Sequence, residues 1–321
     1  MPAIQGHVNF NPDKDIPSLE GKVIFVTGGT AGIGASTVQL LAVHNPSHIY
    51  FSGRNAKASD ALIASIHATH PKVGLTFVPM DLTSLSSVKT ALTTHFTHTR
   101  LDILVCNAGI MAQQTKLSAD GYEIQFAVNH LGNAMVTTYL LPTMLATAKT
   151  SGSDVRIVNL TSLGYGLHPG DGILFDELDA HSVQNRFFMG PWMRYGQSKL
   201  ANILYAAELA RRHPEVTAVS VHPGVVNTDL VYTQTFINRT FIRITNVFMG
   251  EKALEPEQGA WNPVWCAAAA KKEDLKNGGF YVPVGLESSD DLKKDKLAGG
   301  AESVALAKKL WEWTDGILAK V

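Results

Sequence analysis

Hydrophobic positions along the chain fall into two repeating patterns. Short continuous apolar runs, rich in Val, Ile and Leu, alternate with longer stretches in which apolar residues recur at helical spacing. Such apolar runs are typical of strands that are buried on both faces of a sheet. They predict strands over Lys22–Thr27, His48–Ser52, Val73–Pro79, Leu101–Cys106, Val155–Leu160, Val216–Val221 and Gly279–Val282.

The helical stretches lie between these strands, and prolines or capping residues mark several of their ends. Alternation of strand and helix is the signature of right-handed βαβ units and a parallel sheet. We therefore predict an α/β fold of the doubly wound Rossmann type, with a central parallel sheet of about seven strands flanked by helices. The expected helices are Ile33–His44, Ala56–His70, Ser84 to about His98, one or two within Ser118–Ala148, Trp192–Arg212, Glu257–Ala270 and Glu302–Leu318.

The expected domain organisation is simple. Residues 1–20 contain three prolines and no strong periodicity, which predicts an N-terminal arm along the surface. Residues 21–321 contain no internal repeat, low-complexity tract or linker. We expect them to form one Rossmann-type dinucleotide-binding catalytic domain.

Charge and composition argue against several classes of function. Lys and Arg number 27 and Asp and Glu 28, so the net charge of −1 indicates no attraction to nucleic acid or to an anionic membrane. Cys106 and Cys266 are far apart in sequence, and His130 and His222 fit no metal-ligand spacing, so we expect no disulfide and no metal. The N-terminus lacks the apolar core of a signal peptide, and no apolar run approaches the ~20 residues of a membrane span. We expect a cytoplasmic protein.

The stretch Val23–Gly34 predicts a strand, a tight turn and a helix start. Its glycines allow close approach of the backbone to a ligand, and a helix N-terminus favours an anion. Gly28, Gly32 and Gly34 do not have the G-x-G-x-x-G spacing of the common dinucleotide fingerprint. As the first turn of a doubly wound sheet, the stretch nevertheless predicts a pyrophosphate site, with a turn that binds nothing as the alternative.

The second predicted strand indicates which dinucleotide is bound. It ends in Ser52-Gly-Arg54-Asn55, with no acid to accept the ribose hydroxyls. Arg54 is a natural partner for a 2′-phosphate, because guanidinium is always charged and bonds phosphate bidentately. The sequence therefore favours NADP(H) over NAD(H); in the alternative, Arg54 is a solvated loop residue.

Three side chains form a candidate reaction centre. Tyr195 and Lys199 lie four residues apart on one face of a predicted helix. A nearby ammonium is expected to lower the pKa of a phenol, which makes the pair a plausible acid/base unit. Ser162 follows the strand Val155–Leu160 and can hold a carbonyl oxygen. Taken singly, each of these features is also ordinary helix or turn chemistry.

Together the motifs resemble those of the short-chain dehydrogenase/reductase superfamily, from about residue 20 to 285. The resemblance rests on Thr27-Gly-Gly-Thr-Ala-Gly-Ile-Gly34, Cys106-Asn-Ala-Gly109, Asn129, Ser162, Tyr195-x-x-x-Lys199 and His222-Pro-Gly-Val-Val-Asn-Thr228. The segments 191–204 and 256–260 are similar to the retinol-dehydrogenase and WW-domain-oxidoreductase branch.

This resemblance implies the role of each site residue. Tyr195 would donate the proton to a carbonyl or accept it from an alcohol, and Ser162 would stabilise the substrate oxygen. Lys199 would bind the nicotinamide ribose and tune Tyr195, and Asn129 would hold a water of the proton relay. The implied cofactor set is Gly28, Thr30, Gly32, Ile33 and Gly34 at the pyrophosphate, Arg54 and Asn55 at the 2′-phosphate, Asp81 and Leu82 at the adenine, Asn107, Ala108 and Gly109 at the ribose side, Lys199, and Pro223, Gly224, Val226 and Thr228 near the nicotinamide.

Two departures from the family pattern matter. Ala31 stands where many NADP-using members carry a basic residue, so the cofactor prediction depends on Arg54. Ser162 and Tyr195 are 33 positions apart, which is longer than usual for the superfamily. We expect the extra segment, Leu163–Pro191, to form a loop over one edge of the substrate site.

The sequence predicts an NADPH-dependent carbonyl reductase that is reversible to an alcohol dehydrogenase. A substrate lid is expected near residues 228–256, and its apolar side chains favour a medium-sized hydrophobic or aromatic substrate. The same side chains would also suit packing against the domain or a partner. Other readings remain open: reduction of a polyketide or steroid-like ketone in secondary metabolism, or a non-catalytic NADP-binding or interaction module on the same fold. The family's pairing helices make a homodimer a further expectation.

Overall fold

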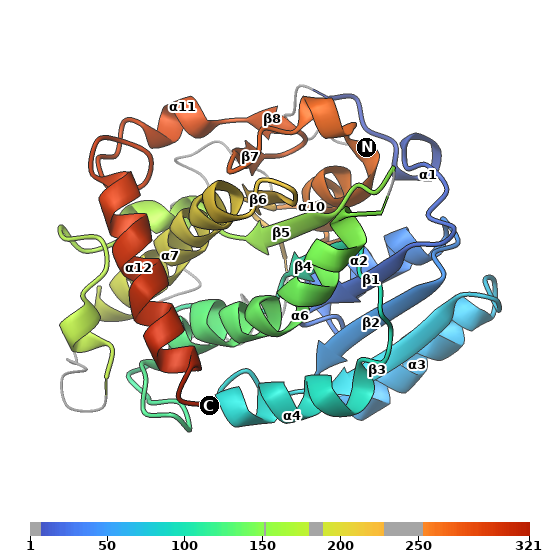
Figure 1. The fold of residues 1–321 in the computed structure, drawn as a ribbon, viewed down its shortest axis with the longest axis horizontal. Helices are drawn as coiled ribbons and strands as arrows, with labels where there is room; N and C mark the ends of the chain where they lie inside the picture. Colours follow the sequence, from blue (N-terminus) through green and yellow to red (C-terminus); the bar gives the residue numbers. More distant parts are fainter. Residues whose placement is uncertain (1–7, 151, 180–188, 228–252) are drawn as a thin grey trace.

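The computed structural model describes residues 8–150, 152–179, 189–227 and 253–321. Within these residues the strands form one eight-stranded sheet in the order β3-β2-β1-β4-β5-β6-β7-β8 (Figure 1). Strands β1 to β7 run parallel, and β8 is antiparallel to β7. The bounds are β1 Val23–Val26, β2 His48–Gly53, β3 Gly74–Pro79, β4 Ile103–Cys106, β5 Arg156–Leu160, β6 Thr217–Val221, β7 Phe280–Val282 and β8 Leu286–Glu287.

The order β3-β2-β1-β4-β5-β6 is that of the doubly wound dinucleotide-binding fold, so the predicted fold class is confirmed. Strand β8 was not predicted, because two residues are too short to give an apolar run. The helices are α1 Pro12–Asp15, α2 Gly32–Ala42, α3 Ala56–His67, α4 Leu85–His95, α5 Ile124–Phe126, α6 Asn133–Ala148, α7 Gly190–Arg212, α10 Pro256–Val264, α11 Ser289–Leu292 and α12 Ser303–Leu318, with π-helical turns η1 Ala127–Gly132 and η4 Trp265–Ala269 and 3₁₀ turns η2 Leu163–Leu167, η3 Phe175–Glu177 and η5 Lys272–Asp274.

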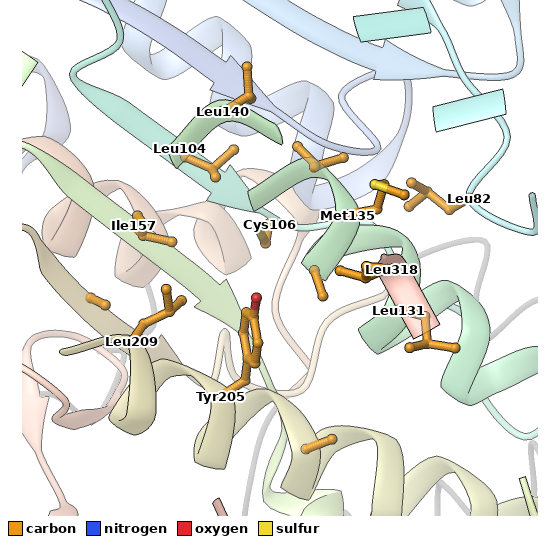
Figure 2. Close-up of a cluster of buried hydrophobic side chains, with 14 of the residues drawn as sticks. Leu82, Leu104, Cys106, Leu131, Met135, Leu140, Ile157, Tyr205, Leu209 and Leu318 are labelled. Atoms are coloured by element: carbon orange, nitrogen blue, oxygen red, sulfur yellow. The ribbon is translucent and has the colours of Figure 1, made fainter. Parts of the chain in front are cut away.

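The sheet separates two hydrophobic layers, as the two-residue periodicity of a strand requires. On β1, Val23 and Phe25 face the layer with α4, α6, α7 and α12, whereas Ile24 and Val26 face the layer with α2, α3 and α10. Figure 2 shows part of the first layer, where Leu104 of β4 lies among side chains from α6 and α7. Burial on both faces explains why these strands are continuously apolar.

The segment predicted as helical from Ser118 begins its helix later, at Ile124. Ser118 instead closes a turn: its backbone N–H donates to the Tyr122 carbonyl, and its hydroxyl accepts from the Tyr122 N–H. Gly121 within this turn has φ +82°, in the left-handed region. The helix then runs on through η1 into α6 and contains Pro142 in its interior.

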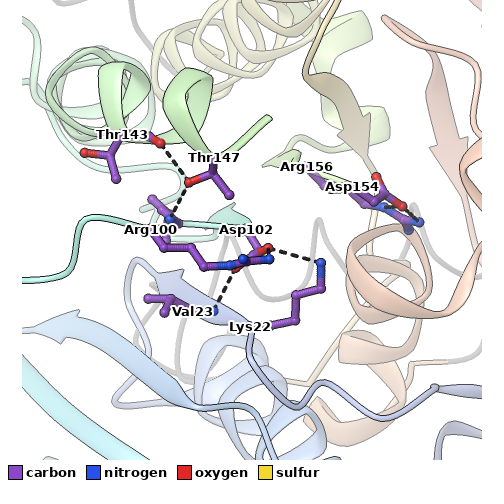
Figure 3. A network of polar contacts seen from close by, with 9 residues as sticks. Lys22, Val23, Arg100, Asp102, Thr143, Thr147, Asp154 and Arg156 are labelled. Carbon is purple, nitrogen blue, oxygen red and sulfur yellow. Dashed lines mark hydrogen bonds and ion pairs between the residues drawn. The ribbon is translucent and has the colours of Figure 1, made fainter. Parts of the chain in front are cut away.

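Buried charges lie at the opposite end of the sheet from the carboxyl ends of its strands. Asp102, just before β4, accepts hydrogen bonds from Arg100, Lys22 and the Val23 backbone (Figure 3). Burial alone would raise the pKa of Asp102, but these donors hold it below its usual range. Each of these partners lies at or just before the beginning of β1 or β4. The network therefore fixes the two strands to each other at their amino-terminal ends.

The C-terminal helix α12 packs along α7, on the side facing away from the sheet (Figure 1). Trp311 stacks on Tyr205 of α7, with ring centroids 5.0 Å apart, and the Arg212 guanidinium lies 4.8 Å from the Trp311 ring. The expected homodimer would pair through the helices within residues 118–148 and 192–212, and α12 covers part of the second of these.

We predict that Trp311→Ala lowers the free energy of unfolding by about 3 kcal/mol, because it removes a buried aromatic side chain from the α12–α7 contact. Val304→Ala is the control, since Val304 lies on the same helix and is 66% exposed. It should change stability by less than about 0.5 kcal/mol. Urea unfolding of both variants tests this, and equal effects of the two substitutions would contradict the assignment of α12 to the core.

Candidate active site

A cavity of about 770 Å³ lies at the carboxyl ends of the parallel strands. Doubly wound sheets bind their ligands at this end of the strands. Its lining includes most of the predicted site residues: Gly28, Thr30, Gly32, Ile33, Gly34, Arg54, Asp81, Leu82, Asn107, Ala108, Gly109, Tyr195, Lys199 and Pro223. Residues from distant parts of the sequence thus meet at one hollow of the size of a ligand site.

The glycine turn between β1 and α2 is tightly fitted. Gly28 and Gly32 have φ values of +65° and +52°, a conformation that side chains rarely adopt. A Cβ built on Gly34 would lie 2.1 Å from the Gly28 carbonyl oxygen and 2.5 Å from Asn107 Nδ2. The backbone is therefore open to the cavity at the helix N-terminus, which fits the pyrophosphate of a dinucleotide.

Hydrogen bonds fix this turn to the end of β4 and to α6. Thr27 Oγ1 is 2.8 Å from Asn133 Oδ1 and accepts a bond from the Ala108 backbone N–H. Asn107 Nδ2 donates to the Thr27 carbonyl at 2.9 Å, and Asn133 Nδ2 donates to the Ala108 carbonyl at 3.0 Å. The cofactor turn and the start of α6 consequently hold one fixed arrangement.

Asn129 lies in the π-helical turn η1, a kind of local distortion that often marks functional sites. Its side chain accepts from the Ile110 N–H at 2.7 Å and donates to the Ile110 carbonyl at 2.9 Å and to Ser198 Oγ at 2.8 Å. Ser198 Oγ donates in turn to the Tyr195 carbonyl at 2.7 Å. Asn129 is thereby connected to the helix that carries Tyr195.

The side chains of Ser162 and Tyr195 lie close together: a Cβ built on Gly164 would be 3.3 Å from Ser162 Oγ and 2.9 Å from Tyr195 Cε1. Ser162 follows β5 and Tyr195 lies on α7, as predicted. The expected lowering of the Tyr195 pKa by Lys199 is wrong in this structure: burial raises the pKa of Tyr195, and the neighbouring Ser162 hydroxyl offsets this only in part. Tyr195 is therefore a protonated phenol at neutral pH.

Lys199 extends to the same place from one turn further along α7. Its Nζ donates to the Leu160 carbonyl at 3.2 Å and lies 5.8 Å from the centre of the Tyr195 ring. A Cβ built on Gly109 would be 3.3 Å from this Nζ and 3.1 Å from Asn129 Oδ1, so both side chains border one point. Burial lowers the pKa of Lys199 to about 8.

The predicted phosphate residues differ in their surroundings. Arg54 is exposed, lines the cavity, and has no hydrogen bond or ion pair with any other residue that the structure describes. Asn55 lies outside the lining, and its side-chain oxygen caps α3 by accepting from the Ala58 N–H. Asp81 accepts from the Thr83 N–H at 3.0 Å, at the adenine end of the predicted site.

Not every predicted residue can be placed at the cavity. Pro223 lines it, whereas Gly224 and Val226 do not and contact Leu254 instead. Asn129 and Ser162 are also outside the lining and lie behind residues that form it, beside Gly109 and Tyr195. Thr228 and residues 228–252 of the predicted lid lie outside the described residues.

A metal site, a membrane-spanning helix or a reactive cysteine would each indicate a different function. No cluster of metal-ligating side chains, and no helix long and apolar enough to cross a membrane, occurs among the residues that the structure describes. Cys106 and Cys266 are buried and unpaired, and burial raises the pKa of each thiol, so neither is suited to act as a nucleophile.

The segment Leu163–Pro191 contacts two different parts of the protein, the reaction centre and helix α12. Leu167 and Met189, near its ends, pack with Trp192 and Tyr195 at the site. Phe175, in its middle, packs on Trp313 of α12 instead. The cover over the substrate site stays a prediction, because residues 180–188 of this segment lie outside the described part of the chain.

Sequence reasoning missed the residues that hold the site together. Asn133 and Ser198 were assigned no role, and the lining residues Gln113–Lys116 were not considered. One signal was available: Asn129 and Asn133 are two amides four positions apart in a helical stretch in which most residues are apolar. Buried amides of this kind are normally hydrogen-bonded, which points to a polar network.

Comparison with known proteins agrees with this geometry. The family profile described as "short chain dehydrogenase" matches residues 22–172. A short-chain dehydrogenase/reductase drtF of Aspergillus calidoustus is 34% identical, covering 95% of this chain and 96% of that protein. Human retinol dehydrogenase 11 is 30% identical, over 92% of this chain and 85% of that protein.

The fold comparison points the same way. The crystal structure of an uncharacterized protein from Mycobacterium paratuberculosis superposes with a TM-score of 0.67 and 25% identity, over 96% of this chain and 97% of that one. With the doubly wound sheet, the glycine turn and the cluster of Ser162, Tyr195 and Lys199, these matches settle the family. The chain belongs to the short-chain dehydrogenase/reductase superfamily of oxidoreductases, in its retinol-dehydrogenase-like branch.

Proposed function

We propose that the protein is an NADPH-dependent carbonyl reductase that acts on medium-sized hydrophobic or aromatic aldehydes and ketones. The observation that carries the proposal is the cluster of three side chains: Tyr195 and Lys199 both line the cavity, and Ser162 lies beside the Tyr195 ring at Gly164. A binding module would not need this arrangement of groups. The reverse reaction, oxidation of an alcohol, uses the same residues.

The protonation state of the site favours reduction. A carbonyl that becomes an alcohol must receive a proton on oxygen, and the raised pKa of Tyr195 keeps that proton on its hydroxyl at neutral pH. Ser162 would hold the carbonyl oxygen and stabilise the negative charge that develops on it. The bound nicotinamide cofactor supplies the hydride to the carbonyl carbon.

Lys199 and Asn129 complete the proposed site. Lys199 would donate from its ammonium to the nicotinamide ribose, and this hydrogen bond is strongest while the group is charged. Because the Lys199 pKa is lowered to about 8, part of its charge is already lost near pH 8. Asn129 would keep the proton route to solvent in place through its bonds to Ile110 and Ser198.

The preference for NADPH depends on Arg54. Its guanidinium lines the cavity at the carboxyl end of β2, where a dinucleotide-binding fold places the adenosine ribose. Ser52 lines the same part of the cavity and can add a neutral hydrogen bond. With no carboxylate in the strand end Ser52–Asn55, a 2′-phosphate would meet no repulsion there.

The surroundings of Tyr195 support an apolar substrate. Ala112 and Trp192 are buried against Tyr195, and Met111, Leu167 and Met189 pack around them. The Trp192 ring meets the Tyr195 ring edge to face, with centroids 6.4 Å apart.

A cytoplasmic location belongs to the same proposal, because two free cysteines suit a reducing compartment.

The reaction can be tested with a panel of aromatic aldehydes and ketones. The wild-type protein should oxidise NADPH with at least one of them, and Tyr195→Phe should lower kcat by about 10²- to 10⁴-fold because the proton donor is lost. NADPH affinity, measured by fluorescence titration, should stay within about twofold. Tight NADPH binding without turnover of any carbonyl would instead favour the interaction module.

The cofactor preference can be tested with Arg54→Asp. Loss of the guanidinium should weaken NADPH binding by about 10- to 100-fold, whereas NADH binding should change little. Lys57→Asp, an equal charge change at an exposed position of α3 outside the lining, is the control. An unchanged NADPH preference in Arg54→Asp would refute the assignment of this residue.

The glycine turn can be tested with Gly34→Ala. The added methyl group would collide with the Gly28 carbonyl and with Asn107, so dinucleotide affinity should fall by at least about tenfold. Gly170→Ala serves as the matched control, because nothing lies within 4 Å of its added Cβ. Equal dinucleotide affinities of the two variants would argue against a pyrophosphate at this turn.

A further inference from the structure

A buried ion pair lies directly behind the reaction centre. Nε of Arg194 is 3.4 Å from Oε1 of Glu123, and the Glu123 side chain is completely buried. Arg194 immediately precedes Tyr195 on α7. The charge of this pair has no part in the proton or hydride chemistry, so its place in the site calls for another explanation.

Each partner also binds elements that form the site. Oε2 of Glu123 accepts from the Phe126 N–H at 2.8 Å and so caps α5, which continues directly into the turn that carries Asn129. Arg194 donates to the Gln113 carbonyl at 3.3 Å, in the loop that lines the cavity. One ion pair therefore joins α7, the helix with Asn129, and the cavity loop.

A second connection runs parallel to the first. Gln125 Nε2 donates to the Pro191 carbonyl at 2.9 Å, in the first turn of α7. The backbone N–H of Glu123 donates to the Leu178 carbonyl at 2.8 Å. Both bonds secure the position of Glu123 from which it reaches Arg194.

We propose that Glu123 and Arg194 are positioning residues that set the place of Tyr195 relative to Asn129 and to the cavity loop. The inference rests on the proposed carbonyl reduction. Small displacements of a reacting group reduce the rate strongly, since a shift of about 1 Å can cost about 100-fold. Loss of the pair should thus lower kcat more than it weakens cofactor binding.

The test uses Glu123→Gln, Arg194→Met and the double variant. Glu123→Gln keeps the shape and an oxygen for the Phe126 N–H but removes the carboxylate charge that faces Arg194. The double variant removes both charges and so avoids an uncompensated buried charge, which should restore most of the stability. Asp102→Asn is the matched control, because Asp102 is an equally buried, ion-paired carboxylate at the other end of the sheet.

In all three site variants kcat should fall by at least about tenfold, with KM for NADPH within about twofold. In Asp102→Asn the melting temperature should fall while kcat stays within about twofold. The double variant should regain thermal stability but not kcat. A double variant with wild-type kcat, or a Glu123→Gln variant that loses only stability, would overturn the proposal.

A readout without substrate separates this inference from the proposed function. The ¹³Cζ resonance of Tyr195, assigned with Tyr195→Phe, reports the surroundings of its hydroxyl. It should shift in the double variant and stay in place in Asp102→Asn. If the wild type reduces no carbonyl, the proposed function fails, and an unshifted resonance in the double variant would separately refute the positioning role.

Discussion

Hydrogen bonds around the Thr27 hydroxyl join parts of the chain that are far apart in sequence. Through Asn133, Ala108 and Asn107 they connect the cofactor turn, the end of β4 and the start of α6. Thr27 and Asn133 are buried, so an unmet partner of either side chain would be costly and the arrangement is strongly preferred. The positions of the glycine turn and of η1 both depend on it, and with η1 the position of Asn129.

Burial decides the electrostatics of the reaction centre. Tyr195 and Lys199 are withdrawn from water by the layers on either side of α7, and both are thereby shifted toward their neutral forms. For Tyr195 this keeps the hydroxyl protonated, as a proton donor requires. For Lys199 it makes the ammonium readily titratable, so an anionic ligand nearby would favour its charged form. The raised pKa of Tyr195 therefore agrees with the proton-donor role proposed for it.

Much of the fold followed from the sequence, because strands buried on both faces must be continuously apolar and their alternation with helices determines a parallel sheet. The clustering of Ser162, Tyr195 and Lys199 also followed, since strand ends and helix spacing are local properties. The Tyr195 pKa was predicted in the wrong direction, because the sequence shows the neighbouring ammonium but not the degree of burial. The late start of the helix at Ile124 was missed although the sequence carried a signal for it, because Asp120-Gly121 is a typical turn dipeptide and Gly is a poor helix former.

The network behind the site could not be predicted, because Glu123 and Arg194 are 71 positions apart and no local pattern pairs them. The two residues meet only once α5 and α7 pack together on the sheet. The same holds for α12. The helical spacing of its apolar residues predicted the helix, but nothing in the sequence indicated that it packs against α7.

The central claim is that Tyr195 protonates a carbonyl oxygen while hydride reaches the carbonyl carbon from a bound nicotinamide. Reduction of a carbonyl with NADPH dideuterated at C4, followed by mass spectrometry of the product, tests this most directly. We expect one deuterium on the former carbonyl carbon with the wild-type protein, and almost no labelled alcohol with Tyr195→Phe. An alcohol product without deuterium, or equal labelled product from both proteins, would contradict the account.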